Sequence, residues 1–223
     1  KRKFLENSSL TRNIFNKNNS IKEFKKFHRP RELSKLNHLK KFVSFKNKSV
    51  LESNCGAGLI LDEVCKDSKS TTGLDDIFYK NYFIKKNKHN FYESADQIIS
   101  NKIKFDIILS LSEIEHKYNP VIFLNKLKKM MTKKSFLILR IPNYNNIYYY
   151  LLGNDYLKFD YRISHNFYFS EKNLDMLFKK LKFKIFSKSG FNEYSSNHLL
   201  TYMERRKRVP MSDIKNYLTK SQD

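Results

Sequence analysis

The sequence predicts an α/β fold built on a mostly parallel β-sheet, and two observations lead to this fold class. Between residues 49 and 141, short apolar runs with the length of strands alternate with segments that have the periodicity of helices. Strands that alternate with helices form parallel sheets with right-handed crossovers. Three of the chain's five glycines, Gly56, Gly58 and Gly73, also fall within one short stretch of this region. A glycine turn after a buried strand is typical of a nucleotide site.

The elements follow one another without a repeat or a low-complexity linker. From Ser20 to Phe45, apolar residues recur at threes and fours, which predicts amphipathic helices interrupted at Arg29-Pro30. Strands are then predicted at 49–52, 70–75, 89–93, 105–110 and 135–141. Helices are predicted at 58–66, 77–86, 95–101, 120–131 and 171–181.

Two further strands are expected at about 183–189 and 198–204. Because no helix separates them, they should pair as a hairpin, and the last strand should run antiparallel to its neighbours. The chain then divides into an N-terminal helical extension at 1–45, a main domain at 46–204 with a cap-like insert at 143–168, and a basic C-terminal tail at 205–223.

The glycine turn and the next strand end carry the strongest indication of function. Gly56 and Gly58 follow a buried strand, and the next strand ends in Asp75-Asp76. A carboxylate about 20 residues after such a turn can accept both hydroxyls of a ribose. The third glycine of the dinucleotide fingerprint is Leu61 here, and no phosphate-binding Gly-Lys-Ser/Thr follows. The turn therefore favours a nucleoside with a short uncharged or zwitterionic extension over a pyrophosphate.

Several motifs resemble those of the class I S-adenosylmethionine-dependent methyltransferases. Residues 50–58, Val-Leu-Glu-Ser-Asn-Cys-Gly-Ala-Gly, are similar to the first motif, and Gly-Leu-Asp at 73–75 is similar to the second. Ile-Glu-His at 114–116, followed by Asn-Pro at 119–120, resembles a step common in the branch that methylates small molecules and sugars. His-Asn-Phe-Tyr-Phe-Ser at 165–170 resembles the start of that branch's last helix. The motifs keep the family's order over about residues 49–191.

This resemblance implies a three-layer, Rossmann-like methyltransferase fold with a seven-stranded sheet of order 3-2-1-4-5-7-6. It also implies S-adenosylmethionine as cofactor and S-adenosylhomocysteine as product. Asn54 stands where the family usually has glycine, and asparagine tolerates the positive φ of such a position. The aspartate expected after the third strand is replaced near Ser94-Ala95, which affects the expected contact to adenine.

The carboxyl ends of the strands should converge beside the first strand, where open α/β sheets bind their ligands. The cofactor-binding residues predicted there are Glu52, Asn54, Cys55, Gly56, Gly58, Asp75, Asp76, Ser94, Ala95, Ser110 and Leu111. Asp75 is the expected ribose acceptor, with a helix cap as its alternative role. Glu52 is equally suited to bracing the turn and to contacting the cofactor's amino group. No metal site is predicted, because Cys55 and Cys65 lack metal-type spacing.

Methyl transfer from a sulfonium needs in-line alignment and, for a hydroxyl acceptor, a base. His165 and His116 lie on segments expected to face the pocket and are the predicted catalytic residues; the alternative for His116 is a structural hydrogen bond. A histidine with a near-neutral pKa suits proton removal. In the tyrosine-rich insert, Tyr144, Tyr148 and Arg162 are the predicted substrate contacts, unless the tyrosines only pin a loop.

Charge and composition leave the acceptor open. The net charge of +22 makes nucleic acid an alternative partner. Only nine of the 44 basic residues are arginines, however, and the lysines spread over many predicted helices. Arg-Arg-Lys-Arg at 205–208 is the sole dense basic run in the sequence. No apolar run approaches the roughly 18 residues that span a bilayer, so we expect a soluble, cytoplasmic protein.

The sequence thus predicts a methyltransferase that uses S-adenosylmethionine to modify a hydroxyl or carbon of a small molecule, such as a sugar or surface-glycan precursor. The alternatives are an RNA methyltransferase and a non-catalytic, cofactor-binding interaction module. The sequence does not determine the oligomeric state.

Overall fold

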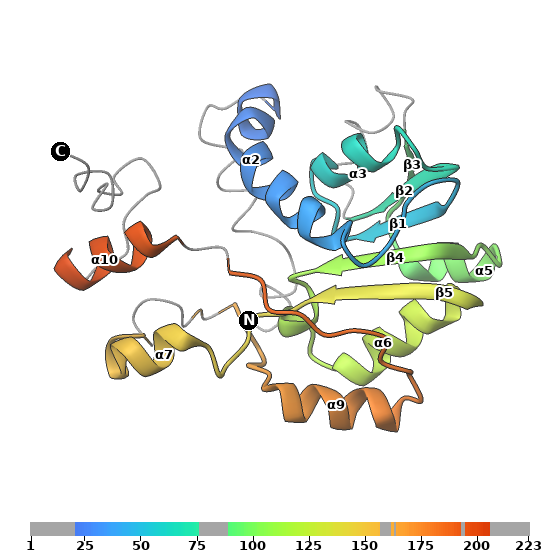
Figure 1. The fold of residues 1–223 in the computed structure, drawn as a ribbon. Coiled ribbons are helices and arrows are strands. Elements are labelled where there is room, and N and C mark those ends of the chain that lie inside the picture. Colours follow the sequence, from blue (N-terminus) through green and yellow to red (C-terminus); the bar gives the residue numbers. More distant parts are fainter. Residues whose placement is uncertain (1–20, 76–88, 157–161, 163, 193–194, 206–223) are drawn as a thin grey trace.

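The computed structural model describes residues 21–75, 89–156, 162, 164–192 and 195–205, with side chains from residue 28 onward, and they form a layered α/β structure (Figure 1). Its sheet has five strands: β1 (Ser49–Ser53), β2 (Ser70–Leu74), β3 (Asn90–Tyr92), β4 (Phe105–Leu111) and β5 (Met131–Arg140). All neighbouring strands are parallel, in the order β3-β2-β1-β4-β5. The α/β fold and the start of the predicted strand order are confirmed.

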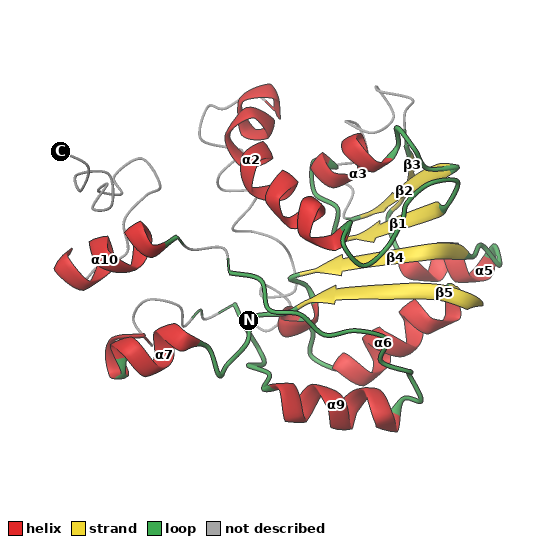
Figure 2. Cartoon of the chain, viewed as in Figure 1, coloured by secondary structure: helices red, strands yellow, loops and turns green. Residues whose placement is uncertain are grey.

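Helices cover both faces of the sheet (Figure 2). On one face, α2 (Ile21–Leu39) and α3 (Leu59–Val64) contribute Leu36 and Ile60 to a core that also holds Val50 of β1. On the other face lie α5 (Ala95–Ser100), α6 (Pro120–Lys129) and α9 (Glu171–Lys180). Leu124 of α6 belongs there to the same core as Leu51, the next residue of β1. Alternate side chains of one buried strand thus serve the two cores.

Beyond the arrowheads of β4 and β5, two helices lie beside the sheet: α7 (Ile147–Leu152) and α10 (Ser196–Arg205) (Figure 1). They share a small apolar cluster of Tyr148, Leu152, Tyr156 and Tyr202. The Tyr202 hydroxyl donates a hydrogen bond to the Asp155 carbonyl at 2.8 Å, which ties α10 to the residues after α7.

The prediction of two final strands is wrong. Residues 198–204 belong to α10, and residues 183–189 carry no strand, although the Phe186 ring contacts Phe136 of β5 with centroids 5.5 Å apart. The segment therefore lies beside β5 without completing a ladder of hydrogen bonds. The described sheet consequently has five strands, where seven were expected.

The predicted break at Arg29-Pro30 is also wrong, because α2 continues through Pro30. Proline removes one helical hydrogen bond, and contacts on both sides of it hold the helix. Leu36 is buried in the core, and Arg29 forms an ion pair with Glu63 of α3. The predicted helix at 77–86, residues 1–20 of the extension and residues 206–223 of the tail lie outside the described residues. None of the described helices is long and apolar enough to cross a membrane.

Candidate functional site

The turn after β1 has the backbone geometry that its sequence requires. Asn54, Gly56 and Gly58 have φ values of 59°, 51° and 66°. Asn54 therefore occupies the left-handed conformation expected of it, and its N–H donates to the Leu74 carbonyl at 2.8 Å. A Cβ on Gly56 would meet no atom within 4 Å. The turn thus exposes its backbone to open space, as a site for close ligand approach requires.

Asp75 joins this turn to the end of β2. Its Oδ2 accepts a hydrogen bond from the Gly56 N–H at 2.7 Å, and its own N–H donates to the Tyr92 carbonyl at 3.2 Å. The carboxylate therefore lies at the carboxyl end of β2, beside the glycine turn, where a ribose acceptor belongs. The alternative role, a cap on the 77–86 helix, and the predicted residue Asp76 lie outside the described residues.

Glu52 lies at the end of β1 and is 6% exposed. Within the described part of the chain, its Oε2 has no hydrogen-bond partner. Burial raises the pKa of this carboxyl well above its usual value; the charge of Glu32 adds to the shift, and that of Lys35 opposes it. Lys35 of α2 forms an ion pair with Glu32 at 2.8 Å. An ammonium group beside Glu52 would satisfy the buried oxygen and stabilise its ionised form.

The third-strand residues have a structural role in this chain. Ser94 is the N-cap of α5, and its hydroxyl accepts a hydrogen bond from the Gln97 N–H at 3.4 Å. Ala95 is the first residue of that helix. These contacts account for both residues without a ligand, so their predicted adenine contact is still untested.

Ser110 and Leu111 end β4. The buried Ser110 hydroxyl donates to Oε2 of Glu113 at 2.8 Å, and Glu113 also pairs with Lys117 at 2.9 Å. Cys55 is buried, and burial raises the pKa of its thiol well above the usual value. The Cys55 thiol therefore contributes packing rather than a nucleophile.

The structure brings the two predicted catalytic histidines together with a carboxylate. Glu115 and His116 lie in the short 3-10 helix η2 (Ile114–His116), and His165 joins them from the insert. The histidine rings meet edge to face with centroids 4.8 Å apart. Glu115 is 1% exposed, and neither carboxylate oxygen has a hydrogen-bond partner among the described residues. We call these three residues the Glu-His-His cluster.

The pKa values in the Glu-His-His cluster differ from the expectation. Burial, with the charges of His116 and Arg162, lowers the pKa of His165 to about 4. Burial also lowers the pKa of His116. The expected near-neutral pKa of His165 is therefore wrong. Burial raises the pKa of Glu115 to about 7, so this carboxyl is better matched than His165 to proton transfer at neutral pH.

Glu115 is the site residue that the sequence analysis missed. It stands in the same Ile-Glu-His motif that identified His116. Only the fold reveals that its side chain is buried next to a histidine from a distant segment.

The three predicted substrate contacts fall in different places. Tyr148 is buried in the apolar cluster between α7 and α10, and its hydroxyl accepts a hydrogen bond from Asn192 Nδ2 at 2.9 Å. This packing agrees with the alternative in which the tyrosines pin a loop, and the substrate contact of Tyr148 stays a prediction. Tyr144 is exposed and follows β5, with its N–H donating to the Phe169 carbonyl at 2.9 Å. Arg162 lies close enough to Glu115 and His165 for its charge to act on both.

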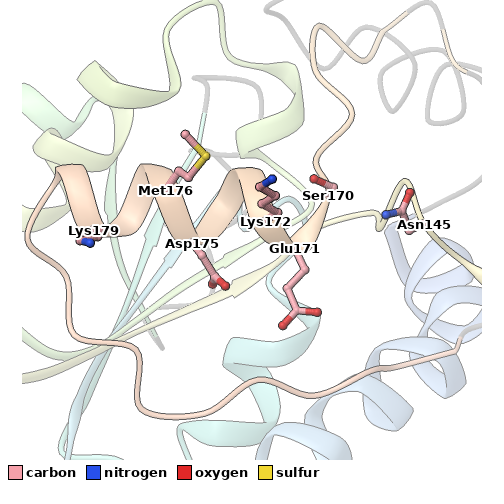
Figure 3. A pocket seen from close by; sticks show the side chains of 7 residues that line it. All are labelled: Asn145, Ser170, Glu171, Lys172, Asp175, Met176 and Lys179. Carbon is pink, nitrogen blue, oxygen red and sulfur yellow. The ribbon is translucent and has the colours of Figure 1, made fainter.

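A hollow of about 510 Å³ lies along α9, and Figure 3 shows the side chains that line it. Its lining residues are Asn145, Ser170, Glu171, Lys172, Asp175, Met176 and Lys179. None of the predicted site residues lines this hollow, and none of its lining residues lies at the end of β1 or β2. The hollow is therefore separate from the candidate cofactor site.

Comparison with known proteins agrees with this geometry. A family model described as a methyltransferase domain matches residues 26–188. The chain is 27% identical over 104 residues to the ubiquinone biosynthesis O-methyltransferase of Pelagibacter ubique (strain HTCC1062), covering 44% of this chain and 43% of that protein. It is 29% identical over 107 residues to the tRNA U34 carboxymethyltransferase of Campylobacter fetus subsp. fetus (strain 82-40), covering 44% and 38%. The matches thus span less than half of these curated relatives.

The fold has solved counterparts as well. The crystal structure of a SAM-dependent methyltransferase from Archaeoglobus fulgidus aligns with a TM-score of 0.52 and 21% identity, covering 79% of this chain and 86% of that one. This likeness concerns the fold, whereas the family model covers most of the chain's length. The chain therefore belongs to the class I S-adenosylmethionine-dependent methyltransferase family.

Proposed function

We propose that this protein transfers the methyl group of S-adenosylmethionine to a hydroxyl or carbon of a small molecule, such as a sugar or surface-glycan precursor. The Glu-His-His cluster carries this proposal. It combines a buried carboxyl whose pKa is raised to about 7 with two histidines whose pKa values are lowered, and it lies just after β4. Such a group suits removal of a proton from a hydroxyl acceptor.

The cofactor would be held by the ends of β1 and β2. Asp75 would accept the ribose hydroxyls, and the open backbone at Gly56 permits close approach. Glu52 would receive the amino group of the methionine part, because it is a buried carboxylate with one oxygen unpartnered in the described residues. The sulfonium supplies an activated methyl group, so the protein's task is chiefly to align the acceptor and remove its proton.

Within this proposal, Glu115 takes the acceptor's proton as the methyl group is transferred. Burial raises the pKa of the Glu115 carboxyl to about 7. Its deprotonated form is therefore a stronger base than an exposed glutamate. Arg162, whose charge acts on Glu115, would help to retain the ionised form before transfer.

RNA is the second candidate acceptor, since one curated relative is named for a tRNA substrate and the chain carries a net charge of +22. The residues between β4 and α9 favour the small molecule, because their Ile-Glu-His and His-x-x-Tyr-Phe-Ser motifs resemble the small-molecule branch. A non-catalytic cofactor-binding module is the third candidate, and it would lack transfer to any acceptor.

A two-stage experiment tests these candidates. Calorimetric titration with S-adenosylhomocysteine first measures cofactor-site binding. Radiolabelled S-adenosylmethionine is then incubated with the protein and separate panels of sugars, quinols and structured RNA. Transfer to a sugar or quinol supports the proposal, and transfer to RNA alone supports the second candidate. Binding without transfer to any panel supports the non-catalytic module, and absence of binding contradicts the site assignment itself.

A further inference from the structure

We propose that Glu115, His116 and His165 bind a divalent transition metal such as Zn²⁺. One ligand atom from each side chain lies within 4.8 Å of the other two. Two imidazole nitrogens and one carboxylate oxygen form a donor set that zinc uses in catalytic sites. The sequence placed His116 and His165 near the same pocket, but it gave no sign that Glu115 joins them as a third donor.

Potential ligand atoms on two of the three residues lack a hydrogen-bond partner among the described residues. Both carboxylate oxygens of Glu115 are buried without a hydrogen bond, and so is Nδ1 of His165. The Glu115 side chain is 1% exposed, so water does not readily replace the missing partners. Buried polar atoms that are left unpaired cost free energy. A single cation at the centre of the cluster would satisfy all three residues at once.

The orientation of His116 is already that of a metal ligand. Its Nδ1–H donates a hydrogen bond to the Ser164 carbonyl at 2.8 Å. The proton on Nδ1 leaves the lone pair of the neutral ring on Nε2. Metal-binding histidines commonly have their second nitrogen fixed in this way by a carbonyl or carboxylate.

The two segments that carry the donors are fastened together by backbone contacts. The N–H groups of Asn166 and Phe167 donate to the Glu115 carbonyl at 2.8 and 3.1 Å. The Asn166 side chain donates to the His116 carbonyl at 2.7 Å. The residue next to His165 is thus docked directly on η2. This positions the third donor before any ion arrives, which lowers the conformational cost of binding.

The donor set also selects the class of metal. Mg²⁺ and Ca²⁺ prefer oxygen ligands, and here a single carboxylate is accompanied by two nitrogens. The positive charges of Arg140 and Arg162 lower the pKa of Glu115, and such charges do not attract a cation. Metal binding therefore depends on the donor atoms rather than on the local charge. Zinc bonds of about 2.0–2.2 Å keep donors less than about 4.4 Å apart. Donors that lie within 4.8 Å of one another reach this separation with at most small side-chain rotations.

Three protein ligands would leave a coordination position open for an acceptor oxygen. A metal there would lower the pKa of a bound hydroxyl, whose proton would then leave to water, because a Glu115 carboxylate that holds the ion no longer serves as the base. This consequence rests on the proposed function, whereas metal binding itself does not depend on the reaction.

The test uses the full chain, stripped with a chelator and titrated with Zn²⁺ by calorimetry and with Co²⁺ by visible absorption. We expect one ion per chain and ligand-field bands typical of a low-coordinate Co²⁺ site. Glu115→Gln and His165→Ala should each weaken Zn²⁺ binding by at least the 10- to 100-fold typical for loss of an outer-shell partner. His38→Ala is the matched control, since His38 lies on α2 outside the cluster, and it should bind like the parent protein.

Thermal unfolding and S-adenosylhomocysteine titration verify that each variant is folded. If His165→Ala fails to fold, Glu115→Gln, which preserves the side chain's size, decides the matter. Absence of stoichiometric binding by the parent protein overturns the proposal, and so does undiminished binding by a folded Glu115→Gln variant. A protein that binds Zn²⁺ but methylates no acceptor would contradict the proposed function and leave the metal site supported.

Discussion

The side chain of Asp75 accepts a hydrogen bond from the backbone N–H of Gly56, with Oδ2 and N 2.7 Å apart. This contact joins the turn after β1 to the end of its neighbouring strand, β2. A residue chosen as a ribose acceptor is thus also part of the turn that would surround the ribose.

Two substitutions at Asp75 separate these roles. Asp75→Ala should weaken S-adenosylhomocysteine binding at least tenfold, because hydrogen bonds to a charged acceptor contribute about 1.5–3 kcal/mol each. Asp75→Asn keeps an oxygen for the Gly56 N–H, and we expect it to retain the parent's thermal stability while binding more weakly. Calorimetric titration and thermal melts measure the two effects. Unchanged affinity in a folded Asp75→Ala variant would remove Asp75 from the site.

Glu52→Gln should stabilise the ligand-free protein at neutral pH. The folded-state pKa of Glu52 is raised, so its stabilising contribution is complete below the unfolded pKa and is lost as the pH increases. The variant's advantage should therefore be absent near pH 4 and grow toward pH 7. Each kcal/mol added to the free energy of unfolding should raise the melting temperature by about 2–4 °C.

Melting curves of both proteins between pH 4 and 8 measure this difference. The same substitution should weaken S-adenosylhomocysteine binding if Glu52 receives the amino group. A pH-independent difference in melting temperature would show that Glu52 is not the titrating group.

His165→Ala should lower the turnover rate by about 10²-fold or more, a typical effect of losing a group that assists proton transfer. Cofactor affinity should stay within about twofold of the parent, because the proposed cofactor contacts lie on β1 and β2. Single-turnover rates at saturating acceptor and calorimetric titration test the two statements. Full activity in this variant would make His165 structural and leave proton transfer to Glu115, with His116 as the next histidine to test.

Binding to generic RNA should be weak and should vanish between about 50 and 200 mM salt, as expected for diffuse contacts to phosphates. The measurement is fluorescence anisotropy with an unstructured and a structured RNA over a salt series. Tight binding to one structured RNA that persists at the higher salt concentration would favour RNA as the acceptor.

The sequence was most informative where local chemistry fixes the backbone. The turn at Asn54, Gly56 and Gly58 needs positive φ values, and residues that tolerate them are the ones present. The strand and helix alternation between residues 49 and 141 likewise predicted the sheet, whose central strands β1, β2 and β4 are buried on both faces.

Prediction failed where tertiary contacts decide the structure. Residues 198–204 were read as a strand, yet they belong to a helix in which Thr201 and Tyr202 are buried, and Tyr202 packs in the apolar cluster shared with α7. A local signal was present: the Ser195 hydroxyl accepts a hydrogen bond from the His198 N–H at 3.4 Å, the geometry of a helix N-cap. The Glu-His-His cluster was less accessible still, because its donors come together only after the insert docks on η2.

Helix α2 determines where the chain can be truncated at its N-terminal side. The sequence-based boundary at residue 45 treats everything before it as an extension, but Leu36 and Phe45 belong to the same core as β1 and β4. Lys35 and Glu32 also act on the charge of Glu52 at the end of β1. A fragment that begins at residue 46 would expose that core and alter the electrostatics of the cofactor site, so recombinant fragments should retain α2.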